Sequence, residues 1–242
     1  MEKIRSIFKN KVLVLDGAMG TMVQSYNLSE NDFRGERFKD HPNDLRGNNE
    51  VLSLTQPDVI SAIHRSYLEA GADIIETNTF SANSISQEDY SLENVVYDLN
   101  KISAELAKSE AKNFTDFPRF VAGAIGPTNR TASLSPDVNN PGFRNVNFDM
   151  LKDSYAEQVR GLYDGGVDIF LIETVFDTLN CKAALFAVSD LLDSEKVDIP
   201  VMISGTITDA SGRTLSGQTV EAFLHSISHV KPIAIGLNCA LG

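Results

Sequence analysis

Three residues that could do chemistry, Asp16, Glu173 and Cys239, each stand at or just past the end of a short apolar run. A continuous apolar run that is stopped by polar residues is typical of a strand buried in a parallel sheet. The C-terminal ends of parallel strands lie at one edge of the sheet, where α/β-barrel enzymes carry their active sites. We therefore expect these three side chains to converge on one site.

The two carboxylates allow two kinds of chemistry. Asp16 and Glu173 could act as a general acid and base, or they could bind the ammonium group of a substrate. A purely structural role is also open, because a carboxylate after a strand can cap the next helix. Gly17 and Gly20 favour binding, since glycines let backbone N–H groups approach a carboxylate or phosphate. Amides that bind an anion beside an acidic side chain would suit the two charged groups of an amino acid.

Cys239 has three possible roles. It could be a small buried hydrophobic residue, a nucleophile that needs a histidine base, or a ligand of a metal. His225 and His229 lie one helical turn apart, but the His-Glu-x-x-His arrangement of zinc enzymes is missing. We expect both histidines on a solvated or half-buried helix face. Cys181 stands at the start of a predicted helix and is expected to pack in the interior.

Six apolar runs alternate with segments of helical periodicity. The predicted strands are 12–15, 74–75, 120–125, 167–172, 201–203 and 233–237, and the predicted helices are 57–70, 92–107, 148–163, 183–192 and 219–229. Such alternation predicts a parallel sheet with crossover helices. The long segments 27–54, 129–147 and 207–218 follow the first, third and fifth strands, so we expect them on the face that carries the strand ends.

A repeated phrase indicates the type of α/β fold. Segments 69–77 and 164–174 both read as the end of a helix, a glycine turn, an aspartate, an apolar strand and then Glu-Thr. Repeated βα units are typical of a (β/α)₈ TIM barrel, of which the chain holds about six units. An open doubly wound sheet is the alternative, but no turn has the glycine spacing of a dinucleotide site. No shift of composition divides the chain, so residues 1–242 are predicted to form a single domain.

Composition limits the partners and the compartment. The net charge is −12, which argues against a nucleic-acid partner because binding to phosphates needs a basic surface. The two cysteines are too few for a disulfide scaffold, so a reducing compartment is expected. The N-terminal segment lacks the apolar run of a signal peptide, and no stretch has transmembrane length. The sequence thus predicts a soluble, cytoplasmic protein with neither a nucleic-acid nor a membrane partner.

Several motifs resemble the homocysteine S-methyltransferase family. They are 16–21 (DGAMGT), 76–80 (ETNTF), 126–130 (GPTNR) and 236–239 (GLNC). More narrowly, the N-terminal module of cobalamin-dependent methionine synthases is similar in segments 33–38 (FRGERF), 131–138 (TASLSPDV) and 204–214 (SGTITDASGRT). The likeness spans residues 12–242, and each motif is several residues long, so chance is a poor explanation.

This resemblance implies a zinc enzyme built on a (β/α)₈ barrel. Homocysteine would bind zinc through its sulfur, and the thiolate would be methylated to give methionine. The methyl donor would be methylcobalamin, held by another module and recharged from methyltetrahydrofolate on a third. The physical chemistry is consistent, because only a thiolate is nucleophilic and coordination to Zn²⁺ deprotonates a thiol.

The resemblance also implies roles for single residues. Cys239 matches the first zinc ligand of the family, and Asp16 and Glu173 match the positions that hold the ammonium group of the substrate. The backbone of three residues would hold the substrate carboxylate: Ala18, Met19 and Gly20. Three further residues would line the pocket: Asn78, Thr206 and Asn238.

The chain departs from the family at the metal site. The second and third zinc ligands of the family are an adjacent cysteine pair in a Gly-Gly-Cys-Cys-Gly motif, which this sequence lacks. One cysteine does not hold zinc tightly, because a catalytic zinc takes about three ligands from protein. We therefore expect a barrel that is incomplete at its C-terminus and inactive by itself. Its open sheet edges would make it aggregate or pair.

Two other functions stay open. The chain could be a non-catalytic fragment that binds an amino acid at Asp16 and Glu173, or that docks onto the missing part of the barrel. A different barrel enzyme, such as an aldolase, would need a Schiff-base lysine at a strand end. None of the predicted strand ends carries a lysine.

Overall fold

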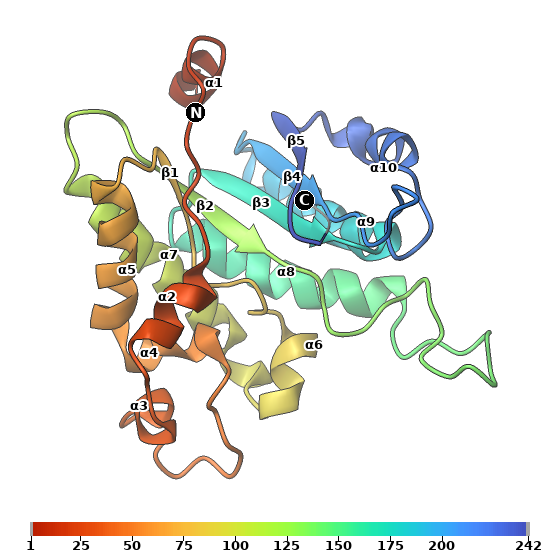
Figure 1. The fold of residues 1–242 in the computed structure, drawn as a ribbon, viewed down its shortest axis with the longest axis horizontal. Coiled ribbons are helices and arrows are strands. Elements are labelled where there is room, and N and C mark those ends of the chain that lie inside the picture. Colours follow the sequence, from red (N-terminus) through yellow and green to blue (C-terminus); the bar gives the residue numbers. More distant parts are fainter. Residues whose placement is uncertain (1, 241–242) are drawn as a thin grey trace.

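The computed structural model describes residues 2–240 and contains one parallel sheet, which is seen in Figure 1. Within those residues the sheet has five strands: β1 (Ile74–Glu76), β2 (Phe120–Ile125), β3 (Ile169–Val175), β4 (Val201–Gly205) and β5 (Ala234–Leu237). Each strand pairs in parallel with the next strand along the chain. The predicted α/β class is confirmed. The strand order fits part of a barrel, whereas a doubly wound sheet reverses its order at a switch point.

The predicted first strand, 12–15, is reduced to a single bridge between Leu15 and Ile74. The carbonyl oxygen of Val14 accepts hydrogen bonds from the N–H groups of Asp73 and Ile74, at 2.8 and 3.1 Å. The segment therefore runs beside β1 without forming a regular ladder. Val14 is 55 % exposed, so this apolar run is not buried on both faces in the way that the pattern predicts.

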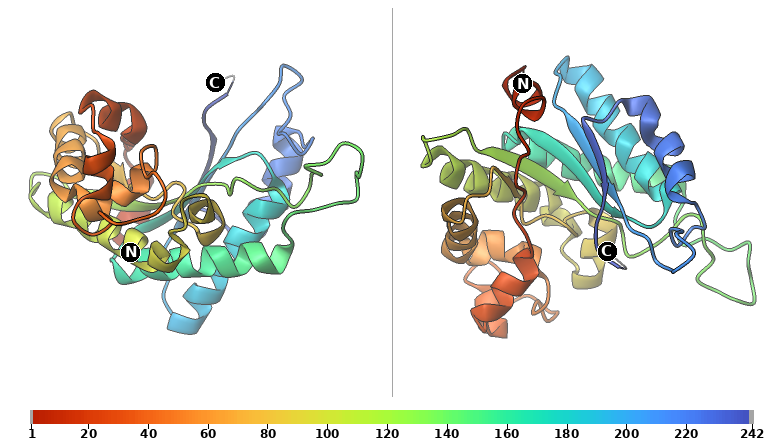
Figure 2. Two further views of the ribbon diagram at one scale, coloured as in Figure 1. Left: turned by 90° about the horizontal axis from the view of Figure 1, so that it is seen from below. Right: turned by 45° about the horizontal axis from the view of Figure 1, so that its top comes forward.

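Three long helices cover one face of the sheet, as Figures 1 and 2 show. They are α7 (Val96–Lys112), α8 (Phe148–Asp164) and α9 (Thr178–Glu195). The apolar sides of these helices and the outward side chains of the strands form one core cluster, which includes Leu162, Phe170 and Leu185. The crossover helices predicted from the sequence thus hold the sheet from its outer side.

Helix α9 starts earlier than predicted because Asp177 caps it. The Asp177 carboxylate accepts hydrogen bonds from the N–H groups of Leu179 and Asn180, at 2.9 and 3.4 Å. The helix therefore begins at Thr178, and Cys181 lies in its first turn. Cys181 is 3 % exposed, so it packs in the interior as predicted.

The other helices surround the sheet. They are α1 (Glu2–Phe8), α2 (Met19–Ser25), α3 (Glu30–Arg34), α4 (Leu52–Thr55), α5 (Pro57–Glu69), α6 (Ser84–Gln87) and α10 (Val220–Ile227), with 3₁₀ turns η1 (Asn49–Val51), η2 (Glu88–Tyr90), η3 (Glu93–Val95) and η4 (Ser228–Val230). Segment 27–54 is more ordered than predicted, because Phe33 of α3 and Leu52 of α4 pack in one cluster with Ile60 of α5. No helix in the described part of the chain combines the length and the apolar character that crossing a membrane requires.

The inner face of the sheet is apolar toward the N-terminal ends of its strands. Ile4 of α1 packs in one cluster with Ile74, Phe120 and Leu171, which belong to β1, β2 and β3. This apolar cluster lies on the inner face of the sheet, below the C-terminal ends of the same strands. Polar side chains next to this cluster are therefore partly shielded from water. Such shielding favours the neutral form of an acidic group, or a charged partner beside it.

Candidate active site

Three carboxyl groups meet at the C-terminal edge of the sheet. Asp16 precedes α2, Glu76 ends β1, and Glu173 belongs to the C-terminal half of β3. The Glu76 N–H group donates to both carboxylate oxygens of Asp16, at 3.1 Å each. Glu76 and Glu173 both line a cavity of about 270 Å³, which we call the acidic cavity. The structure thus brings Asp16 and Glu173 together and adds Glu76, which had no predicted role.

Glu76 and Glu173 meet because they stand on alternate strands. One strand, β2, separates β1 from β3. In an α/β barrel the side chains of one interior layer come from alternate strands, so equivalent positions on β1 and β3 face the same layer. Both glutamates end the repeated apolar phrase with Glu-Thr. That repeat is the sequence signal from which a role for Glu76 could have been predicted.

Burial raises the pKa of all three carboxyl groups. The pKa of Asp16 rises to about 7, because burial and the charge of Glu173 outweigh the hydrogen bond from the Glu76 N–H group. Burial raises the pKa of Glu76, and the charges of Glu173 and Asp16 raise it further. Burial also raises the pKa of Glu173, although the hydroxyl group of Thr174 donates a hydrogen bond to its carboxylate. Burial and mutual repulsion thus both work against three negative charges at this position.

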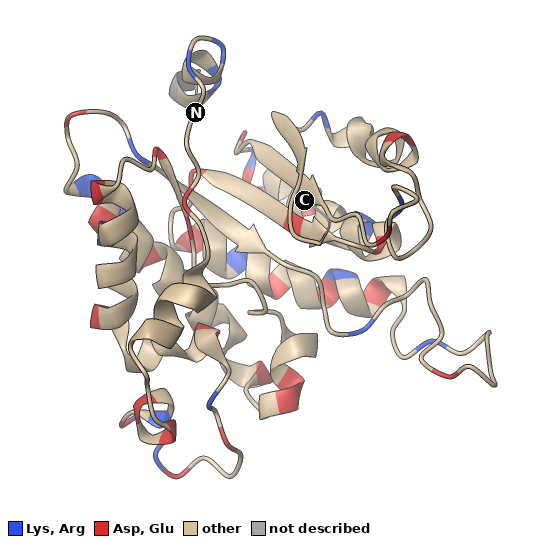
Figure 3. Ribbon diagram, in the orientation of Figure 1, with Lys and Arg blue, Asp and Glu red and all other residues tan. Residues whose placement is uncertain are grey.

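The acidic cavity has no resident cation among the described residues. No lysine or arginine contributes to the pKa shifts of Asp16, Glu76 or Glu173. Figure 3 shows the basic positions mainly on the helices and loops around the sheet. A partly buried acidic cluster without a basic side chain suits a ligand that brings its own ammonium group.

The first turn of α2 offers backbone N–H groups directly after Asp16. Helix α2 begins at Met19, and its N-cap residue, Ala18, makes no side-chain cap hydrogen bond. Gly17 and Ala18 are exposed, so the approach to this turn is open. N–H groups without a capping side chain can bind a carboxylate. The predicted backbone site at Ala18, Met19 and Gly20 therefore lies next to the acidic cavity.

Asn238 joins the ends of two strands to Cys239. Its Oδ1 atom accepts hydrogen bonds from the Thr174 N–H group at 3.1 Å and from Ser204 Oγ at 2.8 Å. Its Nδ2 atom donates to Thr174 Oγ1 at 2.8 Å and to Cys239 Sγ at 3.4 Å. Asn238 lines the acidic cavity together with Glu173, and Cys239 is exposed. The predicted ligand Cys239 thus stands beside a residue of the cavity wall.

The described residues do not form a complete metal site. No group of three or more His, Cys, Asp or Glu residues in this part of the chain could hold a metal ion. His225 of α10 and His229 of η4 are exposed, as expected for a solvated helix face. Burial raises the pKa of Cys181 to about 12. Cys239 remains the candidate ligand among residues 2–240, and zinc would need further ligands beside it.

Two of the predicted lining residues have other contacts. Asn78 is buried and donates to the carbonyl oxygen of Asn49 at 2.7 Å and to Ser53 Oγ at 3.3 Å. Thr206 is also buried, and its N–H group donates to the carbonyl oxygen of Val175 at 2.9 Å. Neither Asn78 nor Thr206 belongs to the wall of the acidic cavity. Both tie neighbouring segments to the sheet instead.

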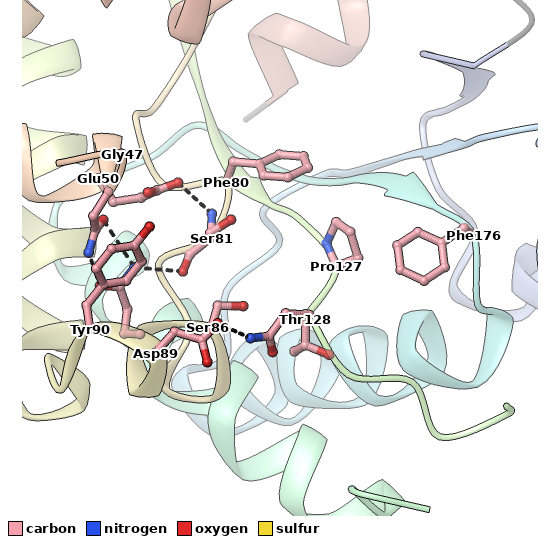
Figure 4. A pocket seen from close by; sticks show the side chains of 13 residues that line it. Gly47, Glu50, Phe80, Ser81, Ser86, Asp89, Tyr90, Pro127, Thr128 and Phe176 are labelled. Atoms are coloured by element: carbon pink, nitrogen blue, oxygen red, sulfur yellow. Dashed lines mark hydrogen bonds between the residues drawn. The ribbon is translucent and has the colours of Figure 1, made fainter. Parts of the chain in front are cut away.

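A second cavity, of about 400 Å³, lies among loops at the same edge of the sheet (Figure 4). Phe80, Pro127 and Phe176 line it from the segments that follow β1, β2 and β3. On the opposite side, Glu50 is 8 % exposed and accepts a hydrogen bond from the Ser81 N–H group at 2.9 Å. Burial raises the pKa of Glu50. No motif pointed to this cavity, because Glu50 lies in the segment that was expected to be irregular.

Comparisons with known proteins bear on the fold and the family. Residues 13–241 match the family model described as homocysteine S-methyltransferase. The metallated form of the homocysteine methyltransferase MmuM from Escherichia coli is similar in structure, with a TM-score of 0.73 and 20 % identity over 98 % of this chain and 77 % of that chain. Its apo form matches with a TM-score of 0.68 and 20 % identity, over 98 % and 76 % of the two chains. At this identity the structural likeness shows a shared fold.

Proposed function

This chain belongs to the homocysteine S-methyltransferase family, and from that premise we propose that the acidic cavity binds homocysteine for methyl transfer to its sulfur, giving methionine. The observation that carries the proposal is a cavity whose wall includes Glu173 and Asn238, the neighbour of Cys239. Asp16 lies beside this cavity, because its carboxylate accepts the N–H group of Glu76, another residue of the wall. This arrangement offers partners for both ends of the substrate.

The charged groups of an amino acid fit two parts of the site. Asp16 and Glu173 would each accept a charge-assisted hydrogen bond from the substrate ammonium group. The substrate carboxylate would accept hydrogen bonds from the backbone N–H groups of Ala18, Met19 and Gly20. With both groups held, the side chain of homocysteine would extend along the cavity wall, so that its thiol approaches Cys239.

A thiol must lose its proton before it attacks a methyl group, because only the thiolate is nucleophilic. Zinc, when bound, would supply that deprotonation. We propose Cys239 as one zinc ligand, although residues 2–240 do not supply a full set. The likeness of segments 33–38, 131–138 and 204–214 to cobalamin-dependent methionine synthases supports methylcobalamin as the donor, recharged from methyltetrahydrofolate by another module.

Calorimetric titration with L-homocysteine tests the binding role. Asp16→Asn and Glu173→Gln should each weaken binding about tenfold to a hundredfold, since a hydrogen bond to a charged group is worth about 1.5–3 kcal/mol. Glu105→Gln, an exposed change on α7, should leave the affinity as it is. 4-Mercaptobutanoic acid, which lacks the amino group, should not distinguish the wild type from the variants. Equal affinity of Glu173→Gln and wild type would reduce Glu173 to a structural residue.

The incomplete ligand set favours a second candidate, a module that binds an amino acid without catalysis. L-Norvaline carries a methyl group where homocysteine carries its thiol, so it separates the two candidates. A methyl-transfer site should prefer homocysteine, and the preference should fall in Cys239→Ser. A module that recognises only the charged ends should bind both ligands alike. Zinc near one ion per chain, lost in Cys239→Ser, would favour the catalytic candidate.

A further inference from the structure

The second cavity contains a buried carboxylate that has unused acceptor positions. Glu50 of η1 lines this cavity, and nine-tenths of the residue is buried. Its Oε1 atom accepts a hydrogen bond from the Ser81 N–H group at 2.9 Å. Within residues 2–240, no other residue donates to the Glu50 carboxylate. A carboxylate can accept about four hydrogen bonds, so Glu50 keeps acceptor positions for a ligand in the cavity.

No basic side chain compensates this carboxylate in the part of the chain that the structure describes. The wall of the second cavity contains neither lysine nor arginine, and it includes another carboxylate, Asp89. The guanidinium group of Arg130, which follows Asn129 of the wall, pairs with Glu88 at 2.7 Å. Burial raises the pKa of Glu50, and a cation beside it would act against that shift. The cavity therefore suits a positively charged ligand.

The neutral groups next to Glu50 are bonded to one another. Asn48 Nδ2 donates to Gln87 Oε1 at 2.7 Å, and Gln87 Nε2 donates to the carbonyl oxygen of Ser81 at 3.0 Å. Both amide side chains are buried and belong to the cavity wall. Their N–H groups are thus directed at other acceptors, and a ligand would have to supply the remaining donors to Glu50.

Phe80 offers an aromatic face to the same cavity. It directly precedes Ser81, and it is 38 % exposed although it is a large apolar residue. Figure 4 shows Glu50 extending toward Phe80, with Phe176 on the far side of the cavity. A cation above an aromatic ring is attracted by the negative face of the ring. The carboxylate and the ring together favour a cation that can both donate hydrogen bonds and stack.

These two features select a guanidinium group from among the organic cations. A quaternary ammonium group has no N–H donor and would leave the buried carboxylate without hydrogen bonds. A primary ammonium group is a strongly hydrated point charge, whereas a guanidinium group is planar, weakly hydrated and able to stack on an aromatic ring. The cavity volume of about 400 Å³ lies in the range of small-molecule sites, about 300–1,000 Å³.

We propose that the second cavity binds a guanidinium group, with the Glu50 carboxylate as the hydrogen-bond acceptor and the Phe80 ring as the stacking surface. The second cavity and the acidic cavity share no lining residue, so this site does not rest on the proposed function. A free guanidinium compound and an arginine side chain of a protein both offer the required chemistry.

Ethylguanidine is the probe, because it carries neither the ammonium nor the carboxylate group that the acidic cavity is proposed to hold. Two-dimensional NMR of the nitrogen-15-labelled 242-residue chain should show shifts of the Ser81 and Tyr90 amide signals. The shifts should saturate with a dissociation constant on the order of 1 mM, as expected for so small a ligand. Ethylammonium and tetramethylammonium should each bind at least about tenfold more weakly, since one stacks poorly and the other has no donor.

Two variants test the two contacts separately. Glu50→Gln keeps an oxygen for the Ser81 N–H group and should weaken ethylguanidine binding about tenfold to a hundredfold. Phe80→Leu keeps an apolar side chain without the ring face and should weaken binding about threefold or more. Glu105→Gln, an exposed change on α7, should bind ethylguanidine as the wild type does. Thermal unfolding checks that each variant is folded, and Phe80→Leu tests the site even if Glu50→Gln does not fold.

Several outcomes would overturn the inference. They are equal affinity of wild type and Glu50→Gln for ethylguanidine, equal binding of tetramethylammonium and ethylguanidine, and shifts around Glu173 in place of Ser81. N-acetylarginine amide distinguishes the two sources of the group. Tighter binding of this peptide-like compound than of ethylguanidine would assign the site to an arginine side chain of a protein, and weaker binding would assign it to a free guanidinium compound.

Discussion

Asn238 and Thr174 are hydrogen-bonded to each other twice. The Thr174 N–H group donates to Asn238 Oδ1 at 3.1 Å, and Asn238 Nδ2 donates to Thr174 Oγ1 at 2.8 Å. Thr174 has a φ of 55°, a left-handed conformation that costs a non-glycine residue about 1–2 kcal/mol. The register between β3 and β4 also shifts here, between Ile172 and Val175. The pair thus holds an irregular part of β3 in place, directly after Glu173.

Replacing Asn238 should therefore lower both the stability of the fold and the affinity for homocysteine. Asn238→Ala leaves the Thr174 N–H group and the Ser204 hydroxyl without their partner, at a cost of about 1–3 kcal/mol, and should weaken homocysteine binding about tenfold or more. Asn238→Asp keeps the accepting oxygen but loses the donor to Thr174 and Cys239, so it should have an intermediate effect. Calorimetric titration and thermal unfolding measure the two effects.

The matched control for this prediction is Asn31→Ala. Asn31 is exposed on α3, and its replacement should change neither measurement. Homocysteine affinity of Asn238→Ala equal to that of wild type would show that Asn238 does not position the site.

The two cysteines should differ in reactivity. Cys239 is exposed, whereas Cys181 is buried and its pKa is raised to about 12, so Cys181 holds almost no thiolate at neutral pH. Iodoacetamide should add one group to the native chain, at Cys239, and two after unfolding in urea. Mass spectrometry of tryptic peptides identifies the sites. Rapid alkylation of Cys181 in the native chain would contradict the packing of α9 described above.

Gly126 should not tolerate a side chain. A Cβ atom at this position would collide with the carbonyl oxygen of Phe80 and lie 2.9 Å from its ring. Gly126→Ala should therefore lower the free energy of unfolding by about 1–3 kcal/mol, the usual cost of overpacking. Gly236→Ala is the control, because a Cβ atom there meets no other atom within 4 Å. Urea unfolding should separate the two variants, and equal midpoints would mean that Phe80 moves freely.

His64 should make the fold sensitive to acid. Its side chain is fully buried, both ring nitrogens lack hydrogen-bond partners, and burial lowers its pKa from 6.5 to about 4. Below about pH 6.5, His64 is protonated in the unfolded chain but stays neutral in the folded chain. The free energy of unfolding therefore falls as pH falls. The loss amounts to about 1.4 kcal/mol per pH unit and about 3 kcal/mol at about pH 4.

His64→Leu should remove much of this slope, and His225→Gln, an exposed change on α10, should not. Unfolding free energies from urea titrations between about pH 4 and about pH 7 check the prediction. A slope in His64→Leu as steep as in wild type would assign the acid sensitivity to other groups.

The bodies of strands and helices follow from apolar patterns, whereas their ends depend on single side chains. The sequence predicts β2 at both ends, because Gly126 and Pro127 stop a continuous apolar run. It places the start of α9 too late, because the cap formed by Asp177 leaves no apolar signal. The sequence also predicts an end of β3 at residue 172, whereas the strand continues to Val175. Its last residues are held by Asn238, which is distant in the chain.

Site residues can be predicted from the sequence when their own local pattern identifies them. They are missed when their position depends on how the strands pair. Asp16 and Glu173 stand at the ends of apolar runs, so each can be selected by itself. Glu76 and Glu173 line one cavity although β2 separates their strands, which is a property of strand order and not of any local pattern. Glu50 is buried by the packing of segment 27–54 onto α5, and no pattern within that segment reveals such long-range burial.

The strand order, which equals the chain order, has a consequence for biosynthesis. A nascent chain emerges N-terminus first at about 5–20 residues per second. Each strand from β2 onward can therefore pair with the preceding strand, which has already been synthesised. Asp16, Glu76 and Glu173 can therefore come together while β5 is still untranslated. The proposed binding site for the amino-acid end of the substrate would thus form on the ribosome before Cys239, the proposed zinc ligand, is added.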